Sequence, residues 1–129
     1  MDPKRWRLLA EAALDRLGVK RPRATIVFVS DRAIRLLNQR FRGRKTATDV
    51  LSFPSGQTKF ERRANPNLGD VVISVERAAA QAALHGLEFD QEVAQLILHG
   101  LLHLCGYDHE TDDGQMNRLE LRLRRHLGI

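Results

Sequence analysis

The segment from Asp90 to Leu104 constrains the fold more than any other part of this 129-residue chain. Its apolar residues occur on nearly every side of a helix of that length: Val93, Ala94, Leu96, Ile97, Leu98, Leu101, Leu102 and Leu104. Such a helix is usually buried, because other elements must cover all of its sides. We therefore expect a central buried helix that begins at Asp90 as its N-cap and is surrounded by the rest of the fold.

The other patterns predict further helices and a few short strands. β-Branched and aromatic residues predict strands over 23–30, 48–53 and 69–75. Capping residues and helical spacing predict helices over 3–17, 31–41, from the third strand to His85, and from Asp112 to Leu127. Residues 54–67, rich in Gly, Pro and Asn, predict an exposed loop beside the site. The predicted fold class is α+β, with a small mixed β-sheet of three to four strands packed against about five helices, in one domain spanning residues 1–129.

Composition places the chain among ordinary globular proteins, with 43% hydrophobic and 29% charged residues. Cys105 is the single cysteine, so no internal disulfide forms and a reducing compartment is expected. The sequence contains no apolar run long enough to span a bilayer and no secretory signal at its start. We expect a cytoplasmic protein.

The charge balance suggests a class of partner. Lysine and arginine exceed the acidic residues, which gives a net charge of +5 and a sequence pI near 10.1. Basic domains of this kind often bind nucleic acid or another polyanion. Many basic surfaces have no specific partner, so charge alone leaves both interpretations open.

Three histidines form the strongest chemical signal. His99 and His103 are four residues apart, so both rings project from one face of the buried helix. Gly106 suits a left-handed exit from that helix, which allows the chain to turn back and bring His109 to the same point. Three imidazoles with an open fourth position are the usual ligand set of catalytic zinc. The prediction is one Zn²⁺ per chain, although nickel or copper also suits these ligands.

Several alternatives belong beside this prediction. The histidines could be held by ordinary hydrogen bonds, although buried imidazoles on such a helix need partners. The spacing also matches the zinc-peptidase signature H-E-x-x-H-x-x-G-x-x-H, but Gly100 replaces the glutamate that serves as its general base. Cys105 could be a fourth ligand, or more simply a small core residue. Asp108 could orient a histidine or cap the last helix.

The segment from His99 to His109, His-Gly-Leu-Leu-His-Leu-Cys-Gly-Tyr-Asp-His, resembles the signature of the YbeY family of bacterial endoribonucleases. Three further blocks agree in family order: Leu37-Asn38-x-x-Phe41-Arg42-Gly43, Thr48-Asp49-Val50-Leu51-Ser52-Phe53-Pro54 and Leu68-Gly69-Asp70-Val71-Val72-Ile73. Met116 and Glu120 also fit the last helix of the family. The resemblance therefore covers most of the chain.

The resemblance implies a single-strand-specific, metal-dependent endoribonuclease that matures ribosomal RNA, notably the 3′ end of the small-subunit RNA, and acts in ribosome quality control. It also implies an α+β fold with the metal at the end of the long buried helix, and it matches Arg42 to the family's active-site arginine. The implied partners are single-stranded RNA, the small ribosomal subunit and ribosome-associated proteins, with no membrane and no DNA. Ala47 and the stretch Arg44-Lys45-Thr46 depart from the usual family pattern, which affects substrate preference more than activity.

A mechanistic hypothesis follows from this resemblance. Arg42 would contact the phosphate through two N–H groups and stabilise charge in the transition state. The approach would be lined by Arg44, Lys45, Arg62 and Arg63. The nucleophile stays open between a water and the RNA 2′-hydroxyl, and the general base stays open among Asp49, Asp70, Asp108 and Glu120. The rival hypothesis is a ribosome-assembly factor whose metal mainly holds the fold.

Overall fold

The chain forms an α+β fold around a three-stranded mixed sheet, as seen in a computed structural model that describes residues 2–19, 23–57, 61, 67–108 and 110–129. Strand β3 (Asn67–Ser74) is central and pairs in parallel with β1 (Arg23–Val29). Strand β2 (Val50–Pro54) pairs antiparallel with the other edge of β3. The predicted α+β class is thereby confirmed, and the strand boundaries differ from the predicted ones by at most two residues.

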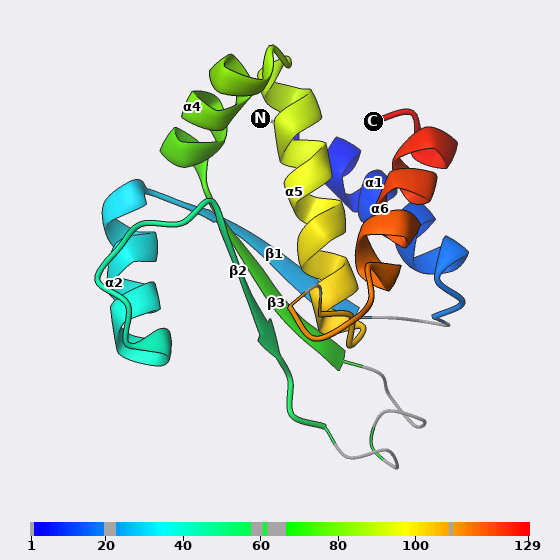
Figure 1. Cartoon of the computed structure of the whole chain (residues 1–129), viewed down its shortest axis with the longest axis horizontal. Coiled ribbons are helices and arrows are strands. Elements are labelled where there is room, and N and C mark those ends of the chain that lie inside the picture. Colours follow the sequence, from blue (N-terminus) through cyan, green and yellow to red (C-terminus); the bar gives the residue numbers. More distant parts are fainter. Residues whose placement is uncertain (1, 20–22, 58–60, 62–66, 109) are drawn as a thin grey trace.

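Helices cover both faces of the sheet, as Figure 1 shows. Helix α5 (Phe89–Leu104) packs on one face, and α1 (Pro3–Arg16) and α6 (Gln115–Leu127) pack against its outer side. Helix α2 (Asp31–Arg42) covers the opposite face. Helix α4 (Val75–His85) continues directly from β3 and packs against α5. Both faces of β3 are therefore covered, which explains its continuous run of buried Val71, Val72 and Ile73.

The central helix is buried as its sequence predicts. Leu98, Leu101 and Leu102 have no exposed surface, and the main core forms where α5 meets the sheet, α1 and α6. A smaller apolar cluster of Ile34, Leu51 and Val72 lies between α2 and the other face. Among the described residues, no helix is long and apolar enough to cross a membrane.

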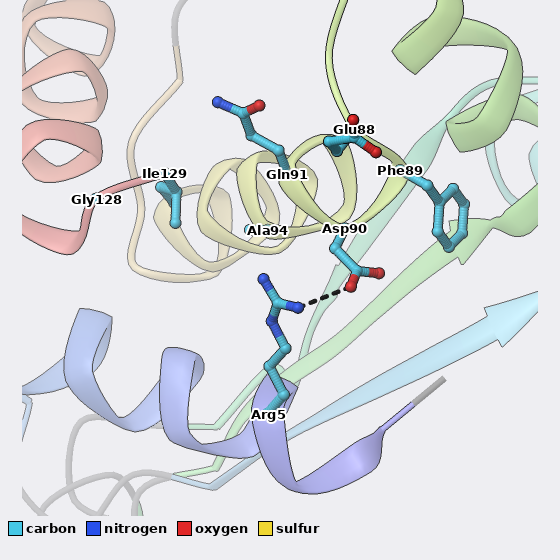
Figure 2. A pocket seen from close by; sticks show the side chains of 8 residues that line it. All are labelled: Arg5, Glu88, Phe89, Asp90, Gln91, Ala94, Gly128 and Ile129. Carbon is cyan, nitrogen blue, oxygen red and sulfur yellow. Dashed lines mark hydrogen bonds and ion pairs between the residues drawn. The ribbon is translucent and has the colours of Figure 1, made fainter.

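The prediction of Asp90 as the N-cap of α5 is wrong. The N-cap is Glu88, whose side chain makes no capping hydrogen bond. The carboxylate of Asp90 lies in the first turn and pairs instead with Arg5 of α1 at 2.7 Å, beside the hollow drawn in Figure 2. Both side chains are about half exposed, so this ion pair contributes well under about 1 kcal/mol to stability.

The ends of α2 and α4 have the usual capping residues, whereas α6 begins later than predicted. Ser30 caps α2 through the amide of Ala33, and Gly86 ends α4 in the left-handed region. Helix α6 begins at Gln115, three residues after the predicted start. Asp112 lies before the helix and accepts hydrogen bonds from the amides of Gly114 and Met116, which satisfies amides at the start of α6.

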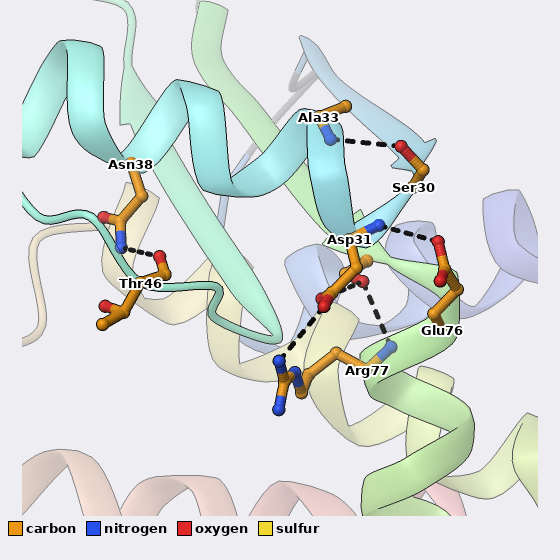
Figure 3. Close-up of polar contacts among 8 residues, drawn as sticks. Ser30, Asp31, Ala33, Asn38, Thr46, Glu76 and Arg77 are labelled. Carbon is orange, nitrogen blue, oxygen red and sulfur yellow. Dashed lines mark hydrogen bonds and ion pairs between the residues drawn. The ribbon is translucent and has the colours of Figure 1, made fainter.

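A polar network joins the starts of α2 and α4 beyond the C-terminal ends of β1 and β3 (Figure 3). Ser74 is fully buried at the end of β3, where its hydroxyl accepts from the amide of Arg77 and donates to Asp31. The guanidinium of Arg77 donates to the same Asp31 carboxylate at 3.1 Å, and Glu76 accepts from the Asp31 amide. The network therefore fixes both helices relative to β3.

Candidate active site

His99 and His103 converge at the C-terminal end of α5. Their Nε2 atoms are 3.2 Å apart, and the rings meet edge to face with centroids 4.8 Å apart. The helix places them on one side because they are one turn apart, as the sequence predicts. Both are only partly buried, and both line a pocket of about 490 Å³.

The pocket lies between the C-terminal end of α5, strand β2 and the turn that follows α5. Its remaining lining residues include three acids and one arginine: Arg42, Thr48, Asp49, Val50, Leu51, Ser52, Pro54, Gly106, Tyr107, Asp108 and Glu110. Gly106 has a φ of 98°, a conformation that other residues rarely adopt, so the predicted glycine turn after the helix is confirmed. The site thus combines two imidazoles, carboxylates and a guanidinium in one hollow.

Gly100 explains how α5 can lie so close to the sheet. A Cβ at this position would lie 2.5 Å from Cγ1 and 3.0 Å from Cγ2 of Val71. The carbonyl of Gly100 accepts a hydrogen bond from the buried hydroxyl of Ser52 at 3.1 Å. Because this position faces the sheet, a glutamate of the peptidase type has no space there.

Arg42 reaches the pocket from the last turn of α2. The C-terminal ends of α2 and α5 lie toward the same end of the sheet (Figure 1), although the two helices cover opposite faces. The Nη2 of Arg42 donates to the carbonyl of Ser52 at 3.3 Å. That bond uses one of the five N–H donors of the guanidinium. Ser52 therefore links two helices. Its backbone carbonyl binds Arg42 of α2, and its side chain binds α5, which carries both histidines.

Glu120 of α6 contacts His99 from outside the pocket. Its Oε1 lies 2.6 Å from Nδ1 of His99, and Arg124 donates to its Oε2 at 3.0 Å. Burial by itself raises the pKa of Glu120, but the hydrogen bond and charge of His99, with the charges of Arg124 and His103, outweigh burial and leave the pKa below its ordinary value. The carboxylate is therefore ionised at neutral pH.

The two described histidines suit a metal ion. Two nitrogens bound to one tetrahedral zinc at about 2.0–2.1 Å lie roughly 3.3 Å apart, close to the observed separation. Within the described residues, no group of three or more histidine, cysteine or acidic side chains is arranged to hold a metal. His109, the third predicted ligand, lies outside those residues. The pair fits zinc, and the complete ligand set stays a prediction.

The remaining candidates for a metal ligand, an orienting residue or a general base lie in different environments. Cys105 is partly buried and packs against the main core. The carboxylate of Asp108 accepts a hydrogen bond from the amide of Glu110 and shapes the turn, and the residue at the N-cap of α6 is Gly114. Asp49 lines the pocket, whereas Asp70 is exposed on β3 and is not part of the lining.

The basic residues expected near the substrate are only partly described. Arg44 and Lys45 follow α2 and are exposed. Arg62 and Arg63 lie outside the described residues, as does most of the predicted 54–67 loop.

Glu120 is the site residue whose role the sequence analysis missed. It was one of four candidates for the general base and was not assigned to a histidine. The signal was its place in the last helix, because Met116, Glu120 and Leu123 share the buried stripe of α6. A carboxylate on an otherwise apolar stripe needs a buried partner, and His99 is that partner.

The fold and the pocket define an α+β protein with a paired-histidine site beside an arginine, and comparison with known proteins assigns its family. The profile of the family described as Endoribonuclease YbeY matches residues 2–128. Relatives named Endoribonuclease YbeY include one from Solibacter usitatus, 48% identical over 103 residues, and one from Anaeromyxobacter sp., 43% identical over 128 residues. The chain belongs to the YbeY family.

These matches cover most of this chain but a smaller share of each relative. The Solibacter match covers 80% of this chain and the Anaeromyxobacter match 98%, but each covers only 65% of the relative. The chain thus spans just under two thirds of the length of these relatives. A solution structure of TM1509 from Thermotoga maritima has the same fold, with a TM-score of 0.63 and 25% identity, over 98% of this chain and 84% of that one.

Proposed function

We propose that this chain is a metal-dependent endoribonuclease that cleaves single-stranded RNA. The observation that supports this most is the convergence of His99 and His103, with Nε2 atoms 3.2 Å apart, in a pocket that Arg42 also lines. The relatives bear the name Endoribonuclease YbeY. The proposed substrate is ribosomal RNA, in particular the 3′ end of the small-subunit RNA, and the proposed compartment is the cytoplasm.

The proposed metal is one zinc ion, held by His99, His103 and His109. When bound, it supplies Lewis acidity that activates water or polarises the phosphate. The chain's own contribution is positional. Arg42, tethered to the Ser52 carbonyl, places a fixed positive charge at the pocket, where it would bind the scissile phosphate and stabilise the charge that develops there.

The test compares metal content and cleavage of a single-stranded RNA on the same preparation, with His103→Ala beside it. We expect one zinc per chain and cleavage in the unaltered protein, and the loss of both in the variant. His126→Ala is the matched control, because His126 is exposed on α6 and should change neither quantity. Loss of metal without cleavage in any of the proteins would favour the assembly-factor hypothesis.

Arg42→Ala separates catalysis from binding. We expect normal zinc content and a 10²–10³-fold drop in cleavage, the typical effect of removing one stabilising donor. Arg32→Ala is the control, since Arg32 is exposed in the first turn of the same helix. Undiminished cleavage by Arg42→Ala would remove this arginine from the active site.

A further inference from the structure

Glu120 is a buried acid that contacts His99, a predicted metal ligand. His99 lines the pocket, but Glu120 is not among the described residues that do so. It is only 7% exposed and lies on the buried stripe of α6 between Met116 and Leu123. Both of its oxygens are engaged, Oε1 by Nδ1 of His99 and Oε2 by Arg124. A carboxylate that is held on both oxygens and is not among the residues that line the pocket is poorly placed to take a proton from a substrate.

The contact is made at Nδ1 of the His99 ring, the nitrogen that does not face His103. A neutral imidazole carries its hydrogen on one nitrogen and a lone pair on the other. A carboxylate beside Nδ1 holds the hydrogen there, which leaves the lone pair on Nε2. In this chain Nε2 of His99 is the atom that faces Nε2 of His103.

We propose that Glu120 is a positioning residue, which holds His99 as the Nδ1–H tautomer and aims its Nε2 lone pair into the pocket. Arg124 fixes the carboxylate by donating to its other oxygen, one turn further along α6. The inference rests on the proposed function, because it takes Nε2 of His99 as a metal ligand. It assigns Glu120 to ligand orientation and removes it from the candidates for the general base.

The substitution Glu120→Gln tests this arrangement without changing the size of the side chain. Arg124 can only donate, so the amide oxygen of the glutamine must face Arg124 and its NH₂ group must face Nδ1 of His99. Nδ1 then has to accept a hydrogen bond. The variant is therefore expected to move the His99 hydrogen to Nε2, which blocks the atom that would bind metal.

A second histidine–glutamate pair supplies the control. His85 of α4 contacts the buried Glu92 of α5 at 3.1 Å through Nδ1, in the same manner as the pair in question. Figure 1 shows α4 at the opposite end of α5 from the turn that leads to α6, and neither residue lines the histidine pocket. Glu92→Gln therefore disturbs a similar contact at a different place.

The first measurement is the tautomer of His99 in the metal-free, ¹⁵N-labelled chain at alkaline pH. We expect the hydrogen on Nδ1 in the unaltered protein and on Nε2 in Glu120→Gln. A hydrogen on Nε2 in the unaltered protein would overturn the inference. This result needs neither a bound metal nor a folded variant, so it holds even where the proposed function fails or Glu120→Gln does not fold.

The second measurement is zinc affinity, obtained by competition with a chromogenic chelator. We expect Glu120→Gln to bind zinc 10–100-fold more weakly than the unaltered chain, the usual effect of losing the partner of a histidine ligand. Glu92→Gln should bind with unchanged affinity. Unchanged affinity and tautomer in Glu120→Gln, with cleavage lost, would overturn the positioning role in favour of a catalytic one. Absence of zinc binding by the unaltered chain would count against the proposed function, and the tautomer would still decide the role of Glu120.

Discussion

At the scale of single residues, Gly100 and Ser52 determine how closely the histidine helix approaches the sheet. The missing side chain at Gly100 lets α5 lie against Val71 of β3, and the Ser52 hydroxyl bonds to the Gly100 carbonyl at that same contact. His99 is the preceding residue, so the packing of Gly100 also sets the depth of His99. The glycine that separates this chain from the zinc peptidases therefore has a packing function of its own.

Gly100→Ala is expected to destabilise the protein by up to about 2 kcal/mol, measured by denaturant unfolding. Replacing glycine by alanine in a helix gains about 1 kcal/mol, but overpacking a buried contact costs about 1–3 kcal/mol. The clash prevails because both methyl groups of the fully buried Val71 lie within 3.0 Å of the new Cβ.

A double-mutant cycle with Val71→Ala tests the cause. In that background both clashing methyl groups are gone, so Gly100→Ala should become neutral or stabilising. Equal destabilisation in the two backgrounds would show that Val71 is not the neighbour that matters.

At the scale of elements, β3 and α4 are joined by a single buried residue that also holds α2. Ser74 ends the strand, caps the helix through the amide of Arg77 and donates to Asp31 of α2. Three elements therefore depend on one hydroxyl. Because Ser74 has no exposed surface, water cannot take over its hydrogen bonds.

Ser74→Ala is expected to lower the free energy of unfolding by about 2 kcal/mol, from the lost cap and the lost donor to Asp31 together. Ser30→Ala is the matched comparison, because Ser30 caps α2 with the same geometry but is exposed. That variant should lose about 1 kcal/mol. Equal losses in the two variants would mean that the Ser74–Asp31 bond contributes nothing.

At the scale of the whole molecule, charge and pocket position suit a polyanionic substrate. The chain carries a net charge of +5, and exposed Arg44 and Lys45 follow the helix that brings Arg42 to the pocket. Aromatic residues make up only 5% of the chain, so stacking of many bases is not available. The binding of the proposed RNA substrate should therefore depend mainly on contacts to its phosphates.

RNA affinity is expected to fall steeply with salt, and Arg44→Gln with Lys45→Gln should flatten that dependence. Each lost contact to a single strand reduces the slope of log K against log salt by about 0.7, so the double variant should lose about 1.4. The measurement is fluorescence anisotropy of a labelled single strand across a salt series. Arg125→Gln, exposed on the last turn of α6, should leave the slope unchanged; an unchanged slope in the double variant would exclude these residues from the RNA path.

Features that depend only on neighbours along the chain could be predicted before the fold was known. The all-round apolar pattern determined the burial of α5, and the four-residue spacing placed His99 and His103 on one face. Capping residues and helical spacing correctly predicted the start of α2 at Asp31 and the end of α4 at His85. These features follow from helix geometry and local hydrogen bonds, which a short segment specifies without the rest of the fold.

The partner of each polar group could not be predicted in this way, because it depends on the packing of whole helices. Asp90 was a plausible cap by sequence, but α1 brings Arg5 against it. Four acids were equivalent candidates by sequence, and the packing of α6 on α5 brings Glu120 to Nδ1 of His99 across 21 positions of the chain. Such contacts depend on how whole helices pack, because a side chain's charge fixes the kind of partner it needs while the fold fixes which partner comes within reach.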